Sequence, residues 1–216
     1  MGGLVGLLLA AGRSTRFGSD KLLHRLPDGR SLLQASLAPL AAAADRVLVL
    51  VRPGPSPLHA HLVAEGIPYL EVPQADLGMG STLAFGIRAT AQAEGWLVGL
   101  ADMPCLAPGT AARIAHALKQ GALVAAPYYQ GRRGHPVGFA ACWQAELAAL
   151  HGDQGARALL QESAAQIEAV EVNDPGCLLD IDTPANLAAL GTRATAGRSP
   201  TARTGIRACG LPRNGK

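Results

Sequence analysis

The sequence predicts an α/β protein in which a doubly wound, mostly parallel sheet lies between two layers of helices. Short apolar runs rich in Val and Leu alternate with helical segments through most of the chain, as expected for strands joined by helical crossovers. The first apolar run, residues 4–11, opens into a loop that begins with a glycine. Ligands of such sheets bind beyond the carboxyl ends of the strands. We therefore expect a three-layer α/β/α fold with its site at that edge.

The expected elements follow in chain order. Strands are predicted at residues 4–11, 46–52, 67–72, 96–101, 123–126, 137–141, 169–172 and 178–181. Helices are predicted at residues 31–44, 57–65, 81–94, 108–120, 143–150, 155–165 and 182–190, and a tight polar turn at 131–136. Ser31 and Gln34 form a capping-box pattern at the start of the first helix. Gly66 fits the end of the second helix, and Pro184 fits the first turn of the last.

The charge of the chain is divided unevenly. The formal net charge is +3, but residues 192–216 contain six Lys and Arg residues and no acid, which leaves 13 basic and 16 acidic residues in 1–191. This tail is rich in Thr, Arg, Gly, Pro and Ala, a composition that cannot bury a core, and it has no aromatic residue to stack on bases. We expect one domain at residues 1–191, a disordered basic tail at 192–216, and no nucleic-acid binding.

The four cysteines and the apolar runs point to a cytoplasmic protein. The cysteines are widely spaced, with no C-x-x-C pair and no zinc spacing, so reduced thiols are expected. The longest apolar runs are too short to span a bilayer, and the N-terminus has no charged region typical of a signal peptide. We expect a cytoplasmic location and no membrane partner.

Residues 9–21 have the composition of a loop that binds a triphosphate. Backbone N–H groups approach phosphates closely where side chains are small, and nearby cations neutralise the remaining charge. The spacing matches neither the P-loop nor the dinucleotide fingerprint. We assign nucleotide binding to the following residues: Leu9, Ala10, Ala11, Gly12, Arg13, Ser14 and Lys21. An ordinary strand end with a solvated basic loop is the alternative.

Three aspartates are candidate ligands of Mg²⁺ (or Mn²⁺). Asp102 follows an apolar strand, where a carboxylate is costly unless a cation meets it. Asp180 and Asp182 are two residues apart, on one side of a predicted strand. Mg²⁺ is commonly held by one or two carboxylates with substrate phosphate and water. Asp180 is favoured over Asp182, because Asp182 is equally well placed to cap the last helix; a strand-end turn residue is the alternative for Asp102.

A second glycine- and hydroxyl-rich turn lies at residues 78–82. Gly80, Ser81 and Thr82 are further nucleotide-binding candidates, because Ser81 or Thr82 can cap the following helix and its N-terminal amides can hold an anion.

Six segments together resemble the molybdenum cofactor cytidylyltransferase family, whose Rossmann-like fold is of the GT-A nucleotidyltransferase type. They are L-L-A-A-G-R-S-T-R-F-G, G-M-G-S-T-L, A-D-M-P, G-R-R-G-H-P-V-G-F, G-D-Q-G-A-R-A-L-L and L-L-D-I-D-T-P, and they span about residues 4–190. The resemblance implies transfer of CMP from CTP to the phosphate of the molybdenum cofactor (molybdopterin), with release of pyrophosphate. It also implies delivery of the product to a molybdenum hydroxylase of the xanthine dehydrogenase type, or to its chaperone.

The resemblance also implies roles for individual residues. Arg16, Lys21 and Asp102 are the expected catalytic residues, with Arg16 assisting the pyrophosphate leaving group. Ala11 is typical of relatives that use CTP, whereas those that transfer GMP usually have Gly there, and the turn at 78–82 is expected to hold the base. The segment 73–76, Pro-Gln-Ala-Asp, departs from the asparagine-proline-x-tryptophan usual in the family.

The acceptor is expected to contact Arg133, Gly134 and His135, since an arginine can clamp a phosphate. A turn histidine satisfied by the backbone is the alternative for His135.

Three other functions fit parts of the sequence. A guanylyltransferase, or a transferase acting on another phosphorylated acceptor, would use the same loop and metal site. An NAD(P)-dependent oxidoreductase of related fold would need a dinucleotide fingerprint that the sequence lacks. A non-catalytic carrier of the pterin would not need Asp102 and Lys21.

Overall fold

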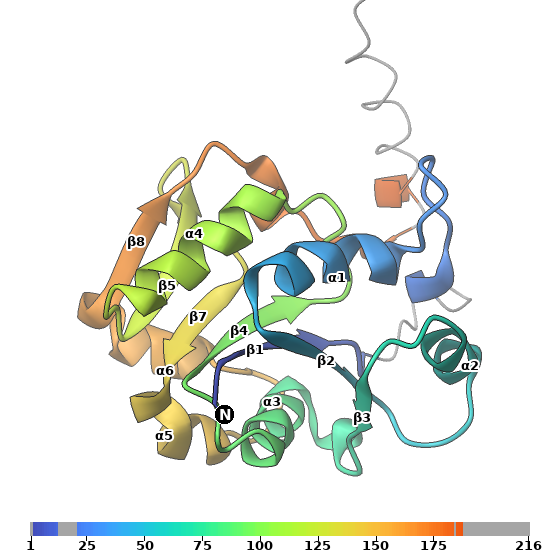
Figure 1. The fold of residues 1–216 in the computed structure, drawn as a ribbon, viewed down its shortest axis with the longest axis horizontal. Coiled ribbons are helices and arrows are strands. Elements are labelled where there is room, and N and C mark those ends of the chain that lie inside the picture. The colour runs from blue at the N-terminus through green and yellow to red at the C-terminus, as the bar shows by residue number, and fades with distance from the viewer. Residues whose placement is uncertain (1, 13–20, 184, 188–216) are drawn as a thin grey trace, which may run out of the picture.

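The computed structural model describes residues 2–12, 21–183 and 185–187, and it has the predicted three-layer α/β/α architecture around one mixed sheet (Figure 1). The strand order is β3-β2-β1-β4-β7-β5-β6, and β8 also pairs with β5. The strands are β1 (Leu4–Leu9), β2 (Arg46–Val51), β3 (Tyr69–Glu71), β4 (Gly95–Leu100), β5 (Val124–Tyr129), β6 (Arg132–Arg133), β7 (Val137–Ala140) and β8 (Ile167–Glu171).

The helices cover both faces of this sheet. The α-helices are α1 (Leu32–Ala43), α2 (Pro57–Ala64), α3 (Met79–Ala89), α4 (Pro108–Lys119), α5 (Gln144–Ala148) and α6 (Arg157–Glu162). Short 3₁₀ turns are η1 (Lys21–Leu23), η2 (Ala75–Leu77), η3 (Ala141–Trp143), η4 (Ala164–Gln166) and η5 (Pro175–Leu178). Helices α1, α2 and α4 pack on one face, and α3, α5 and α6 pack on the other.

The central strand β1 is buried on both sides, which explains its continuous apolar sequence. Leu8 packs with α1 and α2, whereas Leu7 packs with α3, because successive side chains of a strand point to opposite faces. Strands β2 and β4 run parallel to β1, and Leu9 pairs with both Leu50 and Leu100. The three strands therefore end level with one another, and the residues that follow them meet at one edge of the sheet.

The second half of the sheet is antiparallel where β7 inserts between β4 and β5. The segment predicted as a turn at 131–136 contains the two-residue strand β6, which folds back on β5 as a hairpin. Gln130 and Gly131 connect the two strands with positive φ angles of 50° and 73°. These left-handed conformations are typical of tight hairpin connections.

Other predicted elements also differ from the structure, and the helix expected at 155–165 is α6 followed by the separate turn η4. The strand expected at 178–181 is absent: Leu178 ends η5, and the amide of Ile181 donates to the carbonyl of Asp102 at 2.9 Å instead of joining the sheet. The third helix ends at Ala89 and not at residue 94, because the Thr90 hydroxyl donates to Gly86 and accepts from the indole of Trp96.

The caps of the first two helices are as predicted. Ser31 and Gln34 form both hydrogen bonds of a capping box at α1, and Gly66 follows α2 with a φ of 62°. Within the described ranges, no helix combines the length and the apolar character that crossing a membrane requires. Residues 192–216, expected to be a disordered tail, lie outside the described part of the chain.

Candidate active site

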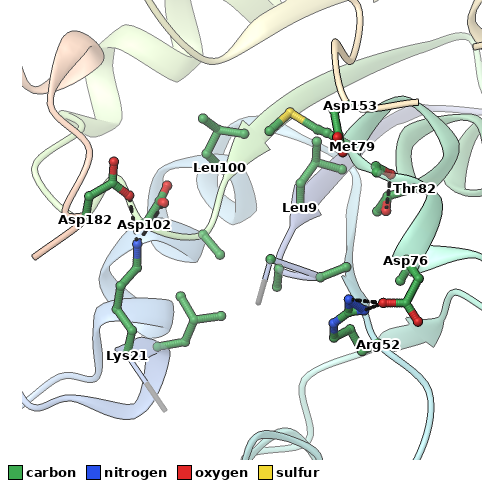
Figure 2. A pocket seen from close by; sticks show the side chains of 17 residues that line it. Leu9, Lys21, Arg52, Asp76, Met79, Thr82, Leu100, Asp102, Asp153 and Asp182 are labelled. Carbon is green, nitrogen blue, oxygen red and sulfur yellow. Dashed lines mark hydrogen bonds and ion pairs between the residues drawn. The ribbon is translucent and has the colours of Figure 1, made fainter. Parts of the chain in front are cut away.

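A cavity of about 720 Å³ lies beyond the carboxyl ends of β1, β2 and β4, within the size range of small-molecule sites (Figure 2). It is lined by Leu9, Ala10, Ala11, Gly12, Lys21, Leu22, Arg52, Ala75, Asp76, Gly78, Met79, Thr82, Leu100, Ala101, Asp102, Asp153 and Asp182. The level ends of the three strands thus bring together residues that are remote in sequence, at the edge where the fold class predicts a ligand.

The start of the predicted triphosphate loop forms part of this cavity. Leu9, Ala10, Ala11 and Gly12 all line it, and no atom of a described residue lies within 4 Å of a Cβ atom added at Gly12. The described residues therefore leave room for a ligand beside Gly12. The other loop candidates, Arg13, Ser14 and Arg16, lie outside the described residues.

Lys21 lies between two of the candidate carboxylates. Its Nζ atom is 3.0 Å from Oδ2 of Asp102 and 3.4 Å from Oδ1 of Asp182, and only 6% of the residue is exposed. The turn η1 supplies Lys21, and the hydrogen bond from Ile181 to Asp102 holds the segment carrying Asp182 beside the end of β4. A cation thus already lies within contact distance of both carboxylates.

Asp182 does not cap the last helix, contrary to the alternative reading of the sequence. The Thr183 hydroxyl accepts from the amide of Asn186, and the Asn186 side chain accepts from the amide of Thr183, so Thr183 provides the cap. Asp182 lines the cavity, whereas Asp180 does not. The geometry therefore favours Asp182 over Asp180 as the second metal ligand, the reverse of the order expected from sequence.

Asp180 is nonetheless close to the other two carboxylates. Burial raises the pKa of the Asp180 side chain, and the negative charges of Asp182 and Asp102 raise it further. Among the residues that the structure describes, no group of three or more Asp, Glu, His or Cys side chains is arranged to hold a metal ion. The arrangement instead fits an ion that is bound by Asp102 and Asp182 and whose remaining ligands are phosphate and water oxygens.

The turn at 78–82 lines the cavity through other residues than the sequence analysis named. Gly78, Met79 and Thr82 line it, but the candidates Gly80 and Ser81 do not. The Gly80 amide donates to the carbonyl of Gly152 at 2.8 Å, and a Cβ atom on Gly80 would lie 2.7 Å from the carbonyl oxygen of His151. The glycine is thus required for close packing against residues 151–152.

Four charged or polarisable residues of the cavity were missed by the sequence analysis: Arg52, Asp76, Met79 and Asp153. Arg52 donates to Asp76 through Nη1 at 2.8 Å and also through Nη2, which closes an ion pair across one side of the cavity (Figure 2). Arg52 directly follows β2. The rule that ligands bind beyond the carboxyl ends of strands, which drew attention to Asp102 after β4, therefore also identifies Arg52. Asp153 lies in a segment that the family resemblance included without assigning it a role.

The acceptor candidates lie apart from this cavity. The Gly134 amide donates to Pro127 and the His135 amide to Cys177, and none of Arg133, Gly134 and His135 lines the cavity. Burial lowers the pKa of His135 to about 4, helped by the charge of Arg133, while Asp180 acts in the opposite direction. His135 is therefore neutral at pH 7, and Arg133 is the cation of this group.

Comparison with known proteins agrees with the geometry. The model of the MobA-like NTP transferase domain matches residues 6–169. The purine catabolism protein PucB of Bacillus subtilis (strain 168) is 32% identical over 196 residues, which cover 84% of this chain and 92% of PucB.

Solved structures of Rv0371c are also similar to this chain over most of its length. Rv0371c from Mycobacterium tuberculosis H37Rv superposes with a TM-score of 0.75 at 27% identity, covering 88% of this chain and 98% of that one. A manganese complex of Rv0371c gives a TM-score of 0.73 at 28% identity, with the same coverage of 88% and 98%. The chain therefore belongs to the family of MobA-like NTP transferase domains and is a nucleotidyltransferase.

Proposed function

We propose that the protein is a Mg²⁺-dependent cytidylyltransferase that transfers CMP from CTP to the phosphate of molybdopterin, giving molybdopterin cytosine dinucleotide and pyrophosphate. The observation that carries the proposal is the position of Lys21 between Asp102 and Asp182 at the cavity beyond β1 and β4. It supports a site in which a buried cation and two carboxylates, proposed here as metal ligands, lie beside a glycine-containing loop. A metal-bound triphosphate needs both.

In this proposal Asp102 and Asp182 hold Mg²⁺, which neutralises charge on the phosphates as it develops. The manganese complex of Rv0371c supports a divalent ion in a related protein. The loop at residues 9–14 holds the triphosphate with its amides, and Lys21 binds a phosphate oxygen once CTP and metal are present. Arg16 stabilises the departing pyrophosphate.

The transfer itself needs no general base. An oxygen of the acceptor phosphate forms a bond to the α-phosphorus of CTP, and the bond from that phosphorus to the bridging oxygen of the β-phosphate breaks. Pyrophosphate leaves with the electron pair of that bond. A phosphate monoester is largely a dianion near neutral pH, so no proton has to be removed from it. Arg133, beside the amides of Gly134 and His135, is proposed to contact this acceptor.

The base is proposed to bind near Thr82, Arg52 and Asp76. If the ion pair between Arg52 and Asp76 opens, Asp76 can accept from the amino group of cytosine and Arg52 can donate to its ring nitrogen or carbonyl. The same two side chains can also pair with the edge of guanine, so transfer of GMP is the second candidate. Ala11 supports CTP, because the resembling family has alanine there when it uses CTP.

The partner enzyme is proposed to be a molybdenum hydroxylase of the xanthine dehydrogenase type, or its chaperone. The name of the relative PucB supports this, because it refers to purine catabolism and xanthine is a purine. A cytoplasmic location remains part of the proposal.

The proposal is tested by measuring pyrophosphate release from CTP, GTP, ATP and UTP with molybdopterin and Mg²⁺. We expect release from CTP at least tenfold faster than from the other nucleotides. Faster release from GTP would favour the second candidate, and no release from any nucleotide would refute transfer to this acceptor. Turnover of NAD(P)H would instead support an oxidoreductase.

A further inference from the structure

Met79 is a methionine at the surface of the cavity beyond β1, β2 and β4. It lines this cavity, and 45% of the residue is exposed. The other methionine in the described part of the chain, Met103, is only 4% exposed and does not line the cavity. An oxidant must reach the sulfur of a thioether, so oxidation is faster at exposed positions. None of the assignments above gives Met79 a role.

The thioether of Met79 packs against the segment 152–155. Its Sδ atom would lie 3.2 Å from a Cβ atom added at Gly155, which has a positive φ angle of 55° and therefore favours glycine. The next residue, Gly80, donates its amide to the carbonyl of Gly152 at 2.8 Å. One hydrogen bond and one sulfur contact thus help to hold the segment 152–155 against the start of α3.

The carboxylate of Asp153 lies beside the same thioether (Figure 2). A Cβ atom added at Gly78 would overlap Oδ1 of Asp153, which places this carboxylate against the residue that precedes Met79. Among the described residues, none forms a hydrogen bond or an ion pair with the Asp153 carboxylate. A thioether fits here because its sulfur is only a weak acceptor. A sulfoxide oxygen is strongly polar, so oxidation would place a second acceptor beside the carboxylate.

We propose that Met79 is a site of reversible oxidation by hydroperoxides, and that its sulfoxide weakens nucleotide binding. A lone pair of Sδ attacks one oxygen of the peroxide, and the O–O bond breaks as the S–O bond forms. The other oxygen leaves with the electron pair of that bond and takes up the proton of the first, as water or an alcohol. Sulfur loses two electrons and the peroxide gains them. Methionine sulfoxide reductases reverse such a step.

Two effects of the sulfoxide lower the affinity for a nucleotide. Its oxygen repels the carboxylate of Asp153, which moves the segment 152–155 away from the start of α3 and changes the wall of the cavity. A nucleotide that covers Met79 must also remove water from the sulfoxide without offering it a donor. This consequence rests on the proposed function, because it requires the nucleotide to bind in this cavity.

The test treats the full chain with hydrogen peroxide and then with dithiothreitol, which reduces disulfides and sulfenic acids but leaves sulfoxides. Peptide mass spectrometry locates the added oxygen, and calorimetry measures the binding of CTP with Mg²⁺. We expect Met79 to be oxidised at least about tenfold faster than Met103. The Kd for CTP should rise about tenfold, the scale of one polar group left unpaired. Methionine sulfoxide reductase should restore the original Kd.

Two leucine variants identify the residue responsible. Met79→Leu has nearly the same volume and no sulfur to oxidise, and Met103→Leu is the matched control at the buried methionine. The Kd of Met79→Leu should be the same before and after peroxide, whereas Met103→Leu should show the loss seen in the wild type. A loss that persists in Met79→Leu, or that the reductase does not reverse, would overturn the inference. So would an unchanged Kd in the wild type once Met79 is oxidised.

Hydrogen exchange separates this inference from the proposed function, because it needs no nucleotide. Oxidation should speed exchange of the Gly80 amide in the wild type and not in Met79→Leu, since the bond to Gly152 is weakened. Unchanged exchange in the oxidised wild type would overturn the inference and leave nucleotide transfer standing. If the untreated wild type binds no CTP, the proposed function is contradicted, and the exchange result alone decides whether oxidation of Met79 alters the cavity.

Discussion

At the scale of single residues, Lys21 has two consequences for the site. Its ammonium group lies within 3.4 Å of both Asp102 and Asp182, where it offsets their charges in a nearly buried position. A divalent ion that binds these carboxylates must compete with Lys21. When a triphosphate enters with the metal, Lys21 gains a new anionic partner, so metal and nucleotide are expected to bind together.

Lys21→Met is therefore expected to raise the affinity for Mn²⁺ in the absence of nucleotide by about tenfold, because the competing cation is removed while both carboxylates remain. The same variant should lose most transfer activity, because the triphosphate loses its cation. Electron paramagnetic resonance of free Mn²⁺ measures the first effect, with Arg46→Ala as control. Equal or weaker Mn²⁺ binding by a folded Lys21→Met variant would show that Lys21 does not occupy the metal position.

The lowered pKa of His135 predicts how the stability of the protein changes with pH. Its pKa is lowered to about 4, chiefly by burial, from the usual histidine value of 6.5. Between these values the unfolded chain binds more protons than the folded one, so the free energy of unfolding rises with pH and is lost as the pH falls from about 6.5 toward 4. We expect His135 to account for about 2 kcal/mol of this loss, after allowance for its partial exposure.

Urea unfolding at pH 7 and pH 4.5 measures this effect in the wild type and in His135→Gln. The variant should lose less stability on acidification than the wild type. The raised pKa of Asp180 acts in the opposite sense, because the folded state then binds the extra proton. An identical pH dependence in the two proteins would mean that His135 does not titrate as its burial implies.

At the scale of secondary-structure elements, the buried carboxylate of Asp174 joins α4 to the segment that carries Asp182. It accepts from the amide of Ala107 at 3.0 Å, from the hydroxyl of Thr110 at 2.6 Å and from the amide of Gly176 at 2.9 Å. It thus holds the start of α4 from a distant part of the chain, where Ala107 at the N-cap position has no polar side chain to form a cap.

Asp174→Ala is expected to lower the free energy of unfolding by about 3 kcal/mol, because it leaves two buried donors and one partly buried donor without their acceptor. Asp28→Ala is the matched control: it removes an exposed carboxylate paired with Arg30, and such pairs contribute less than about 1 kcal/mol. Urea denaturation of the two variants gives both values. A loss of similar size in both would contradict the role given to Asp174.

The elements also show where prediction from sequence succeeds. Ser31 and Gln34 lie three residues apart, so their capping box is local and visible in the sequence. The end of α3 is not local: residues 91–94 favour a helix by propensity, but the bond from Trp96 to Thr90 fixes a different path. Likewise the segment 178–181 does not join the sheet: Ile181 is buried, and its amide donates to the carbonyl of Asp102.

At the scale of the whole molecule, the topology assembles the site. Lys21 is 81 residues from Asp102 and 161 from Asp182, yet all three meet because β1 and β4 are adjacent and end level with each other. The sequence predicts the meeting of the loop after β1 with Asp102, because the carboxyl ends of parallel strands share one edge. It does not predict the choice between Asp180 and Asp182, which depends on the path of an irregular segment.

A cavity of about 620 Å³ between the turn before α1, the β5–β6 hairpin and residues 174–179 illustrates the same limit. Its walls come from four separate segments, and whether Arg132 or Arg133 lines it depends on the register of a two-residue strand. A shift of one residue in that register would exchange the two side chains. The sequence carries no signal that shows which of two neighbouring arginines lines the cavity.

The central claim is that Asp102 and Lys21 bind one metal–triphosphate, and pyrophosphate release by Asp102→Asn tests it most directly. The amide keeps the size of the carboxylate and removes its charge, so we expect the fold to remain, with a thermal midpoint close to that of the wild type. Release from CTP, in the presence of Mg²⁺ and molybdopterin, should fall by at least about a hundredfold. Release at the wild-type rate from this variant would contradict the claim.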